Sequence, residues 1–132
     1  MTFIDTNIFL RFLLKDIESQ YKEAKKLFLK AADGDVKLLS STIVFFELRW
    51  VLGSYYRLSK DKVISILYEI LLLKVEFNER EVLAKSLDLY KSNELDLEDC
   101  YNLIFAKVKK VKTFKTFDIK LAKQFNQIKT LE

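Results

Sequence analysis

The chain has 132 residues, of which 50% are hydrophobic and 32% are charged, and its formal net charge at pH 7 is +4. This length and composition predict one globular domain, residues 1–132. There is no histidine, one cysteine, two glycines and no proline, which excludes histidine-based catalysis, thiolate metal clusters and glycine-rich nucleotide-binding loops. Hydrolytic chemistry here must use carboxylates, lysines, hydroxyl groups or a metal ion.

Short strands and helices alternate along the sequence. In chain order, we expect a strand at 2–5, helices at 6–15 and 19–33, a strand at 36–39, helices at 42–57 and 60–73, a strand at 74–77, helices at 78–90 and 96–109, a strand at 111–117, a helix at 119–126 and a strand at 128–131. The residues suited to cap these helices are Ser19, Ser41 or Thr42, Ser59, Asn78 together with Glu81, and Asp96. Gly34 is expected to end the second helix.

This alternation, without hairpin signals, predicts an α/β fold in which helices cover a parallel sheet. The strand at 111–117 carries Lys112 and Lys115, whereas a buried parallel strand is normally apolar throughout. The longest apolar stretches, at 42–52 and 63–73, contain charged residues and are shorter than the ~20 residues of a membrane span.

The start of the sequence lacks a basic segment and contains Asp5, so it does not fit a signal peptide. The lone Cys100 cannot form a disulfide within the chain. A cytoplasmic protein without a membrane anchor is therefore expected.

Three acidic residues, Asp5, Asp99 and Asp118, lie where a strand ends or a helix begins. In a parallel α/β sheet, ligands collect at the carboxyl ends of the strands, so such acids can converge. Each also has a structural alternative. Asp5 and Asp118 suit helix N-caps, and Asp96 with Asp99 suits the first turn of a helix.

Glu47 lies inside an apolar segment, four residues from both Ile43 and Val51, so these residues share one helical face. An unpaired buried carboxylate is costly or stays protonated. The structural alternative is an ion pair with Arg49 or with a basic residue on a neighbouring helix. N-capping does not explain a glutamate in the middle of a helix.

Four clustered carboxylates would need a multivalent cation, because two of them at ~4 Å repel by about 4 kcal/mol at an effective dielectric constant of 20. Oxygen ligands without histidine or cysteine favour Mg²⁺ or Mn²⁺. The main chemistry of such sites is phosphoryl transfer, in which a metal-activated water attacks in line.

Four segments carry a family resemblance, in the order FIDTNIFL, STIVFFELRWVL, ELDLEDCYNLIFA and TFKTFDIKLAK. Together they resemble the PIN-domain ribonucleases, most closely the VapC-type toxins of toxin–antitoxin pairs, over essentially the whole chain. Cys100 stands where the family favours alanine. The resemblance implies a PIN-like three-layer fold, with a parallel sheet of about five strands flanked by helices.

The resemblance also implies an activity: metal-dependent endonucleolytic cleavage of RNA that leaves a 5′-phosphate. Asp5, Glu47, Asp99 and Asp118 match the acidic quartet that binds Mg²⁺ or Mn²⁺ and carries out catalysis. Asn7, Asp96 and Thr116 match residues that support this quartet. The implied partners are an RNA substrate, a cognate antitoxin protein and a second copy in a homodimer.

Basic residues that follow the acidic segments, Arg11, Lys15 and Arg49, are candidates for phosphate contact. The lysines between 107 and 115 are either a solvated helix end or an RNA track. Two further alternatives are a PIN-family RNA-processing nuclease without an antitoxin, and a non-catalytic interaction domain whose acids are helix caps. Aspartyl-phosphate enzymes do not fit, because the first strand is followed by Asp5-Thr6-Asn7.

Overall fold

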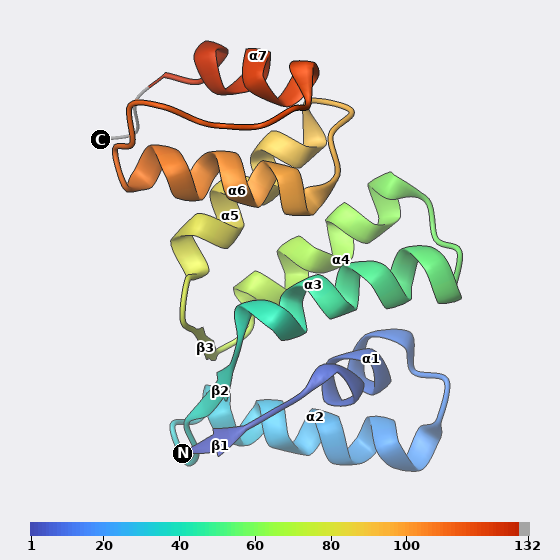
Figure 1. Cartoon of the computed structure of the whole chain (residues 1–132). Coiled ribbons are helices and arrows are strands. Elements are labelled where there is room, and N and C mark those ends of the chain that lie inside the picture. Colours follow the sequence, from blue (N-terminus) through green and yellow to red (C-terminus); the bar gives the residue numbers. More distant parts are fainter. Residues whose placement is uncertain (130–132) are drawn as a thin grey trace. The chain divides into compact units, whose positions relative to one another are not determined.

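The computed structural model describes residues 1–129. By their internal contacts, the residues form two compact units, one from Met1 to Arg80 and one from Glu81 onward (Figure 1). Each unit is described by itself below.

The first unit contains a parallel sheet of three short strands, as the alternation of elements predicted. The strands are β1 (Thr2–Phe3), β2 (Leu38–Ser40) and β3 (Val75–Phe77), in the order β1-β2-β3. Thr2 pairs with Leu38, and Leu38 pairs with Val75. The Ser40 hydroxyl donates to the backbone oxygen of Ile4 at 2.9 Å, which ties the end of β2 to the chain just after β1.

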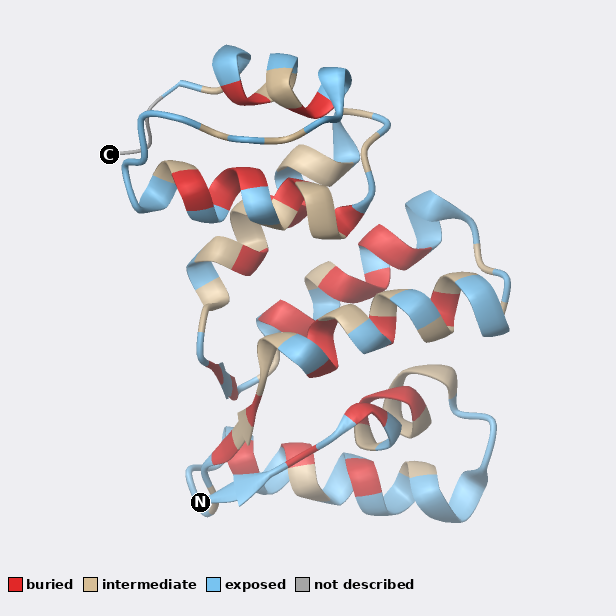
Figure 2. Ribbon diagram, viewed as in Figure 1, coloured by how far each residue is buried: buried red, intermediate tan, exposed pale blue. Residues whose placement is uncertain are grey.

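The helices of the first unit are α1 (Thr6–Leu14), α2 (Glu18–Ala32), α3 (Thr42–Trp50), the π-helical turn η1 (Val51–Tyr55) and α4 (Lys60–Leu72). Phe9 of α1 joins them to the sheet, because its ring centre lies 5.8 Å from that of Phe28 and 6.1 Å from that of Phe77. Figure 2 shows buried residues along these helices interrupted by exposed ones, the pattern of amphipathic helices.

The second unit is helical in the described residues. It contains α5 (Arg80–Lys91), which begins at the last residue of the first unit, α6 (Leu97–Val108) and α7 (Ile119–Gln127). Its core is a cluster of Leu103, Ala106, Leu121 and Phe125. Phe125 stacks on Phe114 with ring centres 5.2 Å apart, and the Lys107 ammonium lies 3.9 Å from the Phe125 ring centre.

The expected fourth strand is wrong. Residues 111–117 connect α6 to α7 without forming a strand, and Lys112 and Lys115 are exposed, so two charges here outweigh the β-favouring residues between them. The sheet therefore has three strands in the described residues and not about five. The expected strand at 128–131 falls partly outside the described residues, and Ile128 and Lys129 are not in a strand.

Several helix ends follow the sequence. Ser41, Ser59 and Asp96 are N-caps of α3, α4 and α6, each accepting a backbone N–H through its side chain. Gly34 follows α2 with a φ of +83°, a conformation that glycine adopts without strain. The chain can therefore turn directly from α2 towards β2.

Two expected caps are wrong. Ser19 lies inside α2, whose N-cap position is Ile17 and has no side-chain cap. Asn78 does not form the expected capping box, since α5 begins at Arg80. The Asn78 side-chain oxygen instead accepts the Thr42 backbone N–H at 2.9 Å and the Thr42 hydroxyl at 3.1 Å. It thereby links the end of β3 to the start of α3.

Candidate functional site

Asp5 lies just after β1, at the carboxyl end of the sheet, where a ligand-binding acid was expected. It is exposed, whereas the preceding Ile4 is buried. Its Oδ1 accepts the Asn7 backbone N–H at 3.2 Å, so Asp5 is also the N-cap of α1. The capping alternative is thus confirmed for Asp5. A single cap bond leaves the other carboxylate oxygen for a ligand.

Glu47 lies in the middle of α3, but the helical face that it shares with Ile43 is not buried. The Glu47 side chain is exposed and Ile43 is 76% exposed. The buried side of α3 is formed by Val44, Phe45 and Leu48. The expected desolvation cost at Glu47 therefore does not arise, and its charge does not need a partner to be tolerated.

Glu47 lines a cavity of about 290 Å³ together with Asn7 and Arg11 of α1. The structure thus brings together three of the residues that the sequence singled out. The other residues of the cavity wall are Thr6, Leu10, Trp50, Val51, Tyr55 and Tyr56.

Arg11 already has an acidic partner. Its Nη1 donates to both carboxylate oxygens of Asp16 at 2.7 Å, and its Nη2 donates to the Tyr56 hydroxyl at 3.3 Å. The hydrogen bond with Tyr56 is the largest influence on the Arg11 pKa and raises it; burial opposes this, and Asp16 adds to it. An RNA phosphate at Arg11 would have to compete with the Asp16 carboxylate.

The other two candidates for phosphate contact are placed differently. Lys15 is the C-cap of α1, with a φ of 54°, and its ammonium lies 5.5 Å from the Tyr21 ring centre. It lines a separate cavity of about 510 Å³ with Phe12 and Phe28. Arg49 is half-buried on α3, two residues after Glu47, a spacing that does not put two side chains on one helical face.

In the second unit, Asp96 and Asp118 begin the helices α6 and α7. Asp96 Oδ1 accepts the Asp99 backbone N–H at 2.8 Å, and Asp118 Oδ1 accepts the Leu121 backbone N–H at 3.1 Å. The Asp118 backbone N–H in turn donates to the Thr116 hydroxyl at 3.1 Å. Two of the supporting residues, Asp96 and Thr116, therefore contact the backbone of Asp99 and Asp118 respectively.

The fold disfavours the ionised form of Asp99. Burial raises its pKa most, and the negative charges of Asp96 and Asp118 raise it further, followed by Glu98. These carboxylates therefore act on one another. A divalent cation would relieve this repulsion, and carboxylate oxygens are the ligands that Mg²⁺ and Mn²⁺ prefer.

The donor chemistry thus fits a hard cation, but the geometry is not a closed cage. Within either unit, the described residues include no group of three or more acidic, histidine or cysteine side chains positioned to hold a metal ion. Of the four acids expected to bind metal, Asp5 and Glu47 belong to the first unit, and Asp99 and Asp118 belong to the second.

Sequence reasoning missed the aromatic wall beside Glu47. Trp50 lies three residues after Glu47 on the same helix, so helical spacing alone could have placed it there. Tyr55 and Tyr56 could not be placed in this way, because the π-helical turn that carries Tyr55 changes the spacing.

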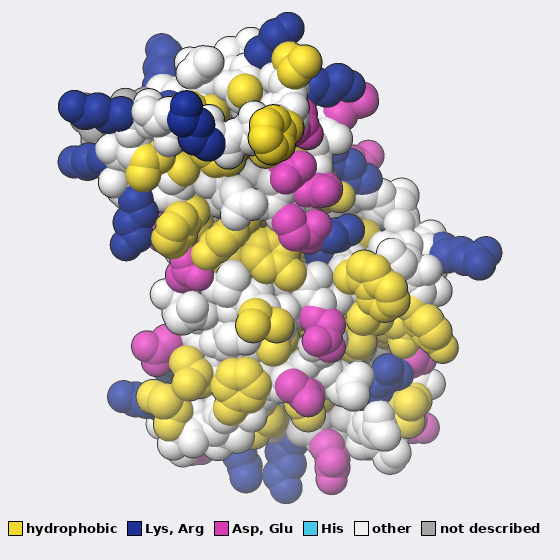
Figure 3. Space-filling view, viewed as in Figure 1, with side chains coloured by type: hydrophobic (Ala, Val, Ile, Leu, Met, Phe, Trp, Pro, Cys, Tyr) yellow, Lys and Arg dark blue, Asp and Glu magenta, His cyan; other side chains and the backbone are white. Residues whose placement is uncertain are grey.

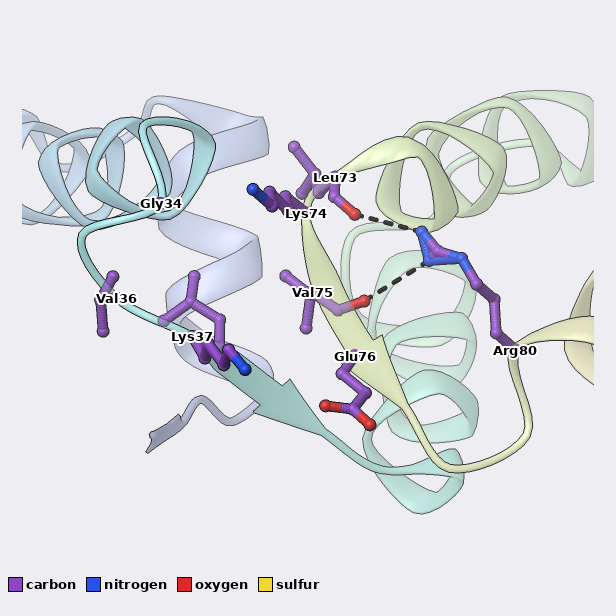
Figure 4. A pocket seen from close by; sticks show the side chains of 9 residues that line it. Gly34, Val36, Lys37, Leu73, Lys74, Val75, Glu76 and Arg80 are labelled. Atoms are coloured by element: carbon purple, nitrogen blue, oxygen red, sulfur yellow. Dashed lines mark hydrogen bonds between the residues drawn. The ribbon is translucent and has the colours of Figure 1, made fainter.

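A cavity of about 420 Å³ lies at the other end of the sheet, where strands β2 and β3 begin (Figure 4). Lys37 and Lys74, which directly precede β2 and β3, are among the residues that line it. Arg80 donates there to the backbone oxygens of Leu73, at 3.1 Å, and Val75, at 3.4 Å. Because Asp5 follows β1 at its carboxyl end, and neither Asp5 nor Glu47 lines this cavity, it is separate from the two candidate metal ligands of the first unit.

Comparison with known protein families gives a match over most of the chain. The model of the PIN domain family matches residues 2–125, a span that includes all four acids. A search of curated proteins gave no match. Among the described residues, no helix combines the length and the apolar character needed to cross a bilayer. The chain belongs to the PIN domain family, whose members are generally metal-dependent nucleases.

Proposed function

We propose that this protein is an endoribonuclease of the VapC toxin type, which uses Mg²⁺ or Mn²⁺ to cleave RNA and leave a 5′-phosphate. The observation that carries the proposal is Asp99 in a PIN-family chain. Its pKa is raised by burial and by the neighbouring carboxylates of Asp96 and Asp118. A carboxyl group whose pKa is shifted by burial together with specific charged neighbours is typical of functional sites.

In this proposal, Asp5, Glu47, Asp99 and Asp118 hold the metal and are the catalytic residues. A divalent cation, when bound, lowers the pKa of water and so supplies a nucleophile without a histidine base. Asp96 and Thr116 are positioning residues, because they hold the backbone at Asp99 and Asp118. Asn7 supports Asp5, since its backbone N–H fixes one carboxylate oxygen.

The non-catalytic interpretation draws on a specific observation, because the side chains of Asp5, Asp96 and Asp118 are all helix N-caps. Capping does not account for the other two acids. Glu47 is exposed in the middle of α3, a position that an ordinary surface glutamate can occupy, so it does not separate the two interpretations. The Asp99 carboxylate is disfavoured by burial and by its acidic neighbours, and it favours the nuclease over an interaction domain.

The proposal includes a cytoplasmic homodimer that a cognate antitoxin inhibits. Exposed apolar side chains such as Leu29 and Phe3 are compatible with a protein partner. Co-expression with the product of a small adjacent gene tests the antitoxin: relief of growth inhibition supports a toxin, and unchanged growth favours an RNA-processing nuclease that has no antitoxin. Sedimentation equilibrium of the purified protein tests the homodimer.

The first experiment compares the wild-type protein with Asp99→Asn by Mn²⁺ calorimetry and by cleavage of total RNA, with and without EDTA. Glu94→Gln, at an exposed acid of the second unit, is the matched control. We expect metal binding and EDTA-sensitive cleavage in the wild type and in the control, and loss of both in Asp99→Asn. Equal behaviour of all three proteins without metal uptake would overturn the proposal.

The chemistry of the products provides an independent check. Hydrolysis by a metal-activated water leaves a 5′-phosphate and a 3′-hydroxyl on the fragments. Ligation of an adaptor that requires a 5′-phosphate should therefore succeed without prior kinase treatment. Fragments that ligate only after kinase treatment would contradict this mechanism.

A further inference from the structure

The cavity beside Glu47 has an aromatic wall that the proposed cleavage chemistry does not use. Trp50, Tyr55 and Tyr56 line it, and Asn7 and Glu47 contribute polar groups. Trp50 is 57% exposed and Tyr55 is 72% exposed. Large aromatic side chains at the surface, gathered around polar groups, mark a surface that binds something.

Contacts with Tyr56 and Arg11 hold the aromatic wall in place. The rings of Tyr55 and Tyr56 meet edge to face with centres 5.0 Å apart. The Tyr56 hydroxyl accepts a hydrogen bond from Arg11, whose guanidinium is fixed by Asp16. Tyr56 is half-buried, so it supports the ring of Tyr55, which remains exposed. The exposed ring of Tyr55 is therefore supported by residues that are themselves held by hydrogen bonds.

We infer that Trp50 and Tyr55 form a stacking platform for unpaired bases of single-stranded RNA, next to Glu47. Aromatic side chains bind every base through its flat face, so such a platform tolerates different sequences but requires unpaired bases. The inference rests on the proposed ribonuclease function and adds to it the two residues that contact the unpaired bases.

The polar groups of the cavity fit bases better than phosphates. The amino groups of adenine and cytosine are hydrogen-bond donors, and the Glu47 carboxylate and the Asn7 side-chain oxygen are acceptors. Arg11, the cation in the wall, is already paired with Asp16. The wall therefore offers base contacts and little free positive charge, and the backbone phosphates must be held elsewhere.

A second copy of this chain fits the same face less well. Along α3, Glu47 lies between the exposed residues Ile43 and Trp50, and Figure 3 shows hydrophobic and acidic side chains next to one another over this part of the molecule. A twofold interface centred here would bring two Glu47 carboxylates together and desolvate them. The amino group of an unpaired base would instead donate a hydrogen bond to the Glu47 carboxylate.

Trp50 is the only tryptophan in the chain, so its fluorescence reports directly on this face. The probe is a random-sequence pool of single-stranded RNA of about 12 nucleotides, within the range that stacking domains cover. EDTA is present throughout to prevent cleavage. We expect quenching of Trp50 by the single-stranded pool and much weaker quenching by a duplex of the same length.

Two variants at one position then separate stacking from apolar contact. Trp50→Phe keeps an aromatic face, whereas Trp50→Leu keeps apolar surface without one. By anisotropy of labelled RNA, we expect Trp50→Leu to weaken binding about fivefold or more and Trp50→Phe to weaken it much less. Leu72→Ala, which removes an 85% exposed apolar side chain outside the cavity, should bind like the wild type.

Three outcomes would overturn the inference: no quenching by single-stranded RNA, equal binding by Trp50→Leu and the wild type, or a Trp50 emission shift that follows protein concentration without RNA. The last would assign the face to a second copy. If RNA cleavage persists in any of these cases, the ribonuclease proposal survives and the platform alone fails. If RNA quenches Trp50 but is not cleaved when metal is added, the platform survives and the nuclease proposal fails.

Discussion

At the scale of single residues, Asp99 connects stability to function. Its ionised form is disfavoured in the folded state by burial and by Asp96 and Asp118. Because its folded pKa lies above its unfolded pKa, it lowers stability as the pH rises through the folded pKa, and this penalty is absent below the unfolded pKa of about 3.9.

Asp99→Asn should therefore stabilise the metal-free protein at neutral pH, by less than about 1 kcal/mol because the group keeps part of its solvent contact. The advantage should disappear in acid. Urea denaturation in EDTA at neutral and at acidic pH measures this difference. A loss of stability at neutral pH would mean that the favourable position of Asp99 at the start of α6 outweighs the repulsion.

Metal binding should make the wild type more stable than Asp99→Asn, the reverse of the order expected without metal. Mn²⁺ binding to the folded protein alone raises stability by about 2.7 kcal/mol when its concentration is 100 times its dissociation constant. We expect Mn²⁺ to raise the melting temperature of the wild type and of Glu94→Gln, and to leave that of Asp99→Asn nearly unchanged. An equal rise in all three proteins would place metal binding away from Asp99.

The sequence identified each acid but not its surroundings. Asp5, Asp96 and Asp118 lie at helix starts as expected, because N-capping depends on local chain geometry. The burial of Glu47 was predicted wrongly, because an apolar neighbour such as Ile43 indicates a core only when another element covers it. That depends on tertiary packing, which helical spacing does not specify.

At the scale of elements, Asn78 fixes the start of the helix that carries Glu47. Its side-chain oxygen accepts hydrogen bonds from the Thr42 backbone and hydroxyl. Asn78→Ala should destabilise the protein by about 1 kcal/mol, the usual net contribution of a hydrogen bond, because the Thr42 backbone N–H loses its acceptor. Urea denaturation measures this cost, with Asn126→Ala on an exposed face of α7 as control. Equal loss in both variants would show that the link to Thr42 contributes nothing specific.

Most helices were predictable from the sequence, but their irregular turns were not. A single helix was expected over 42–57, but α3 passes into a π-helical turn in which the Tyr56 N–H donates to the Val51 oxygen at 3.0 Å. Hydrophobic periodicity does not distinguish this turn from an α-helix over so few residues. Its effect is local and large, because it sets where Tyr55 and Tyr56 lie relative to Trp50.

At the scale of the whole molecule, the sequence predicted the family and the parallel sheet, while the number of strands was wrong. The PIN match extends from residue 2 to residue 125 and so includes both compact units. The acids proposed to bind metal are divided equally between those units. Variants in both units therefore test whether these acids work as one centre.

If Asp5 and Asp99 serve one metal centre, their substitutions should not act independently. Asp5→Asn and Asp99→Asn should each lower RNA cleavage by about 100-fold or more. The double variant should cleave RNA nearly as fast as the less active single variant, because the effects of residues that act as a unit are strongly non-additive. The measurement is the cleavage rate of the wild type, the two single variants and the double variant at saturating Mn²⁺, with circular dichroism to verify folding. A centre already disabled through one ligand has little activity left to lose through the other. Two losses that multiply would therefore mean that Asp5 and Asp99 act separately.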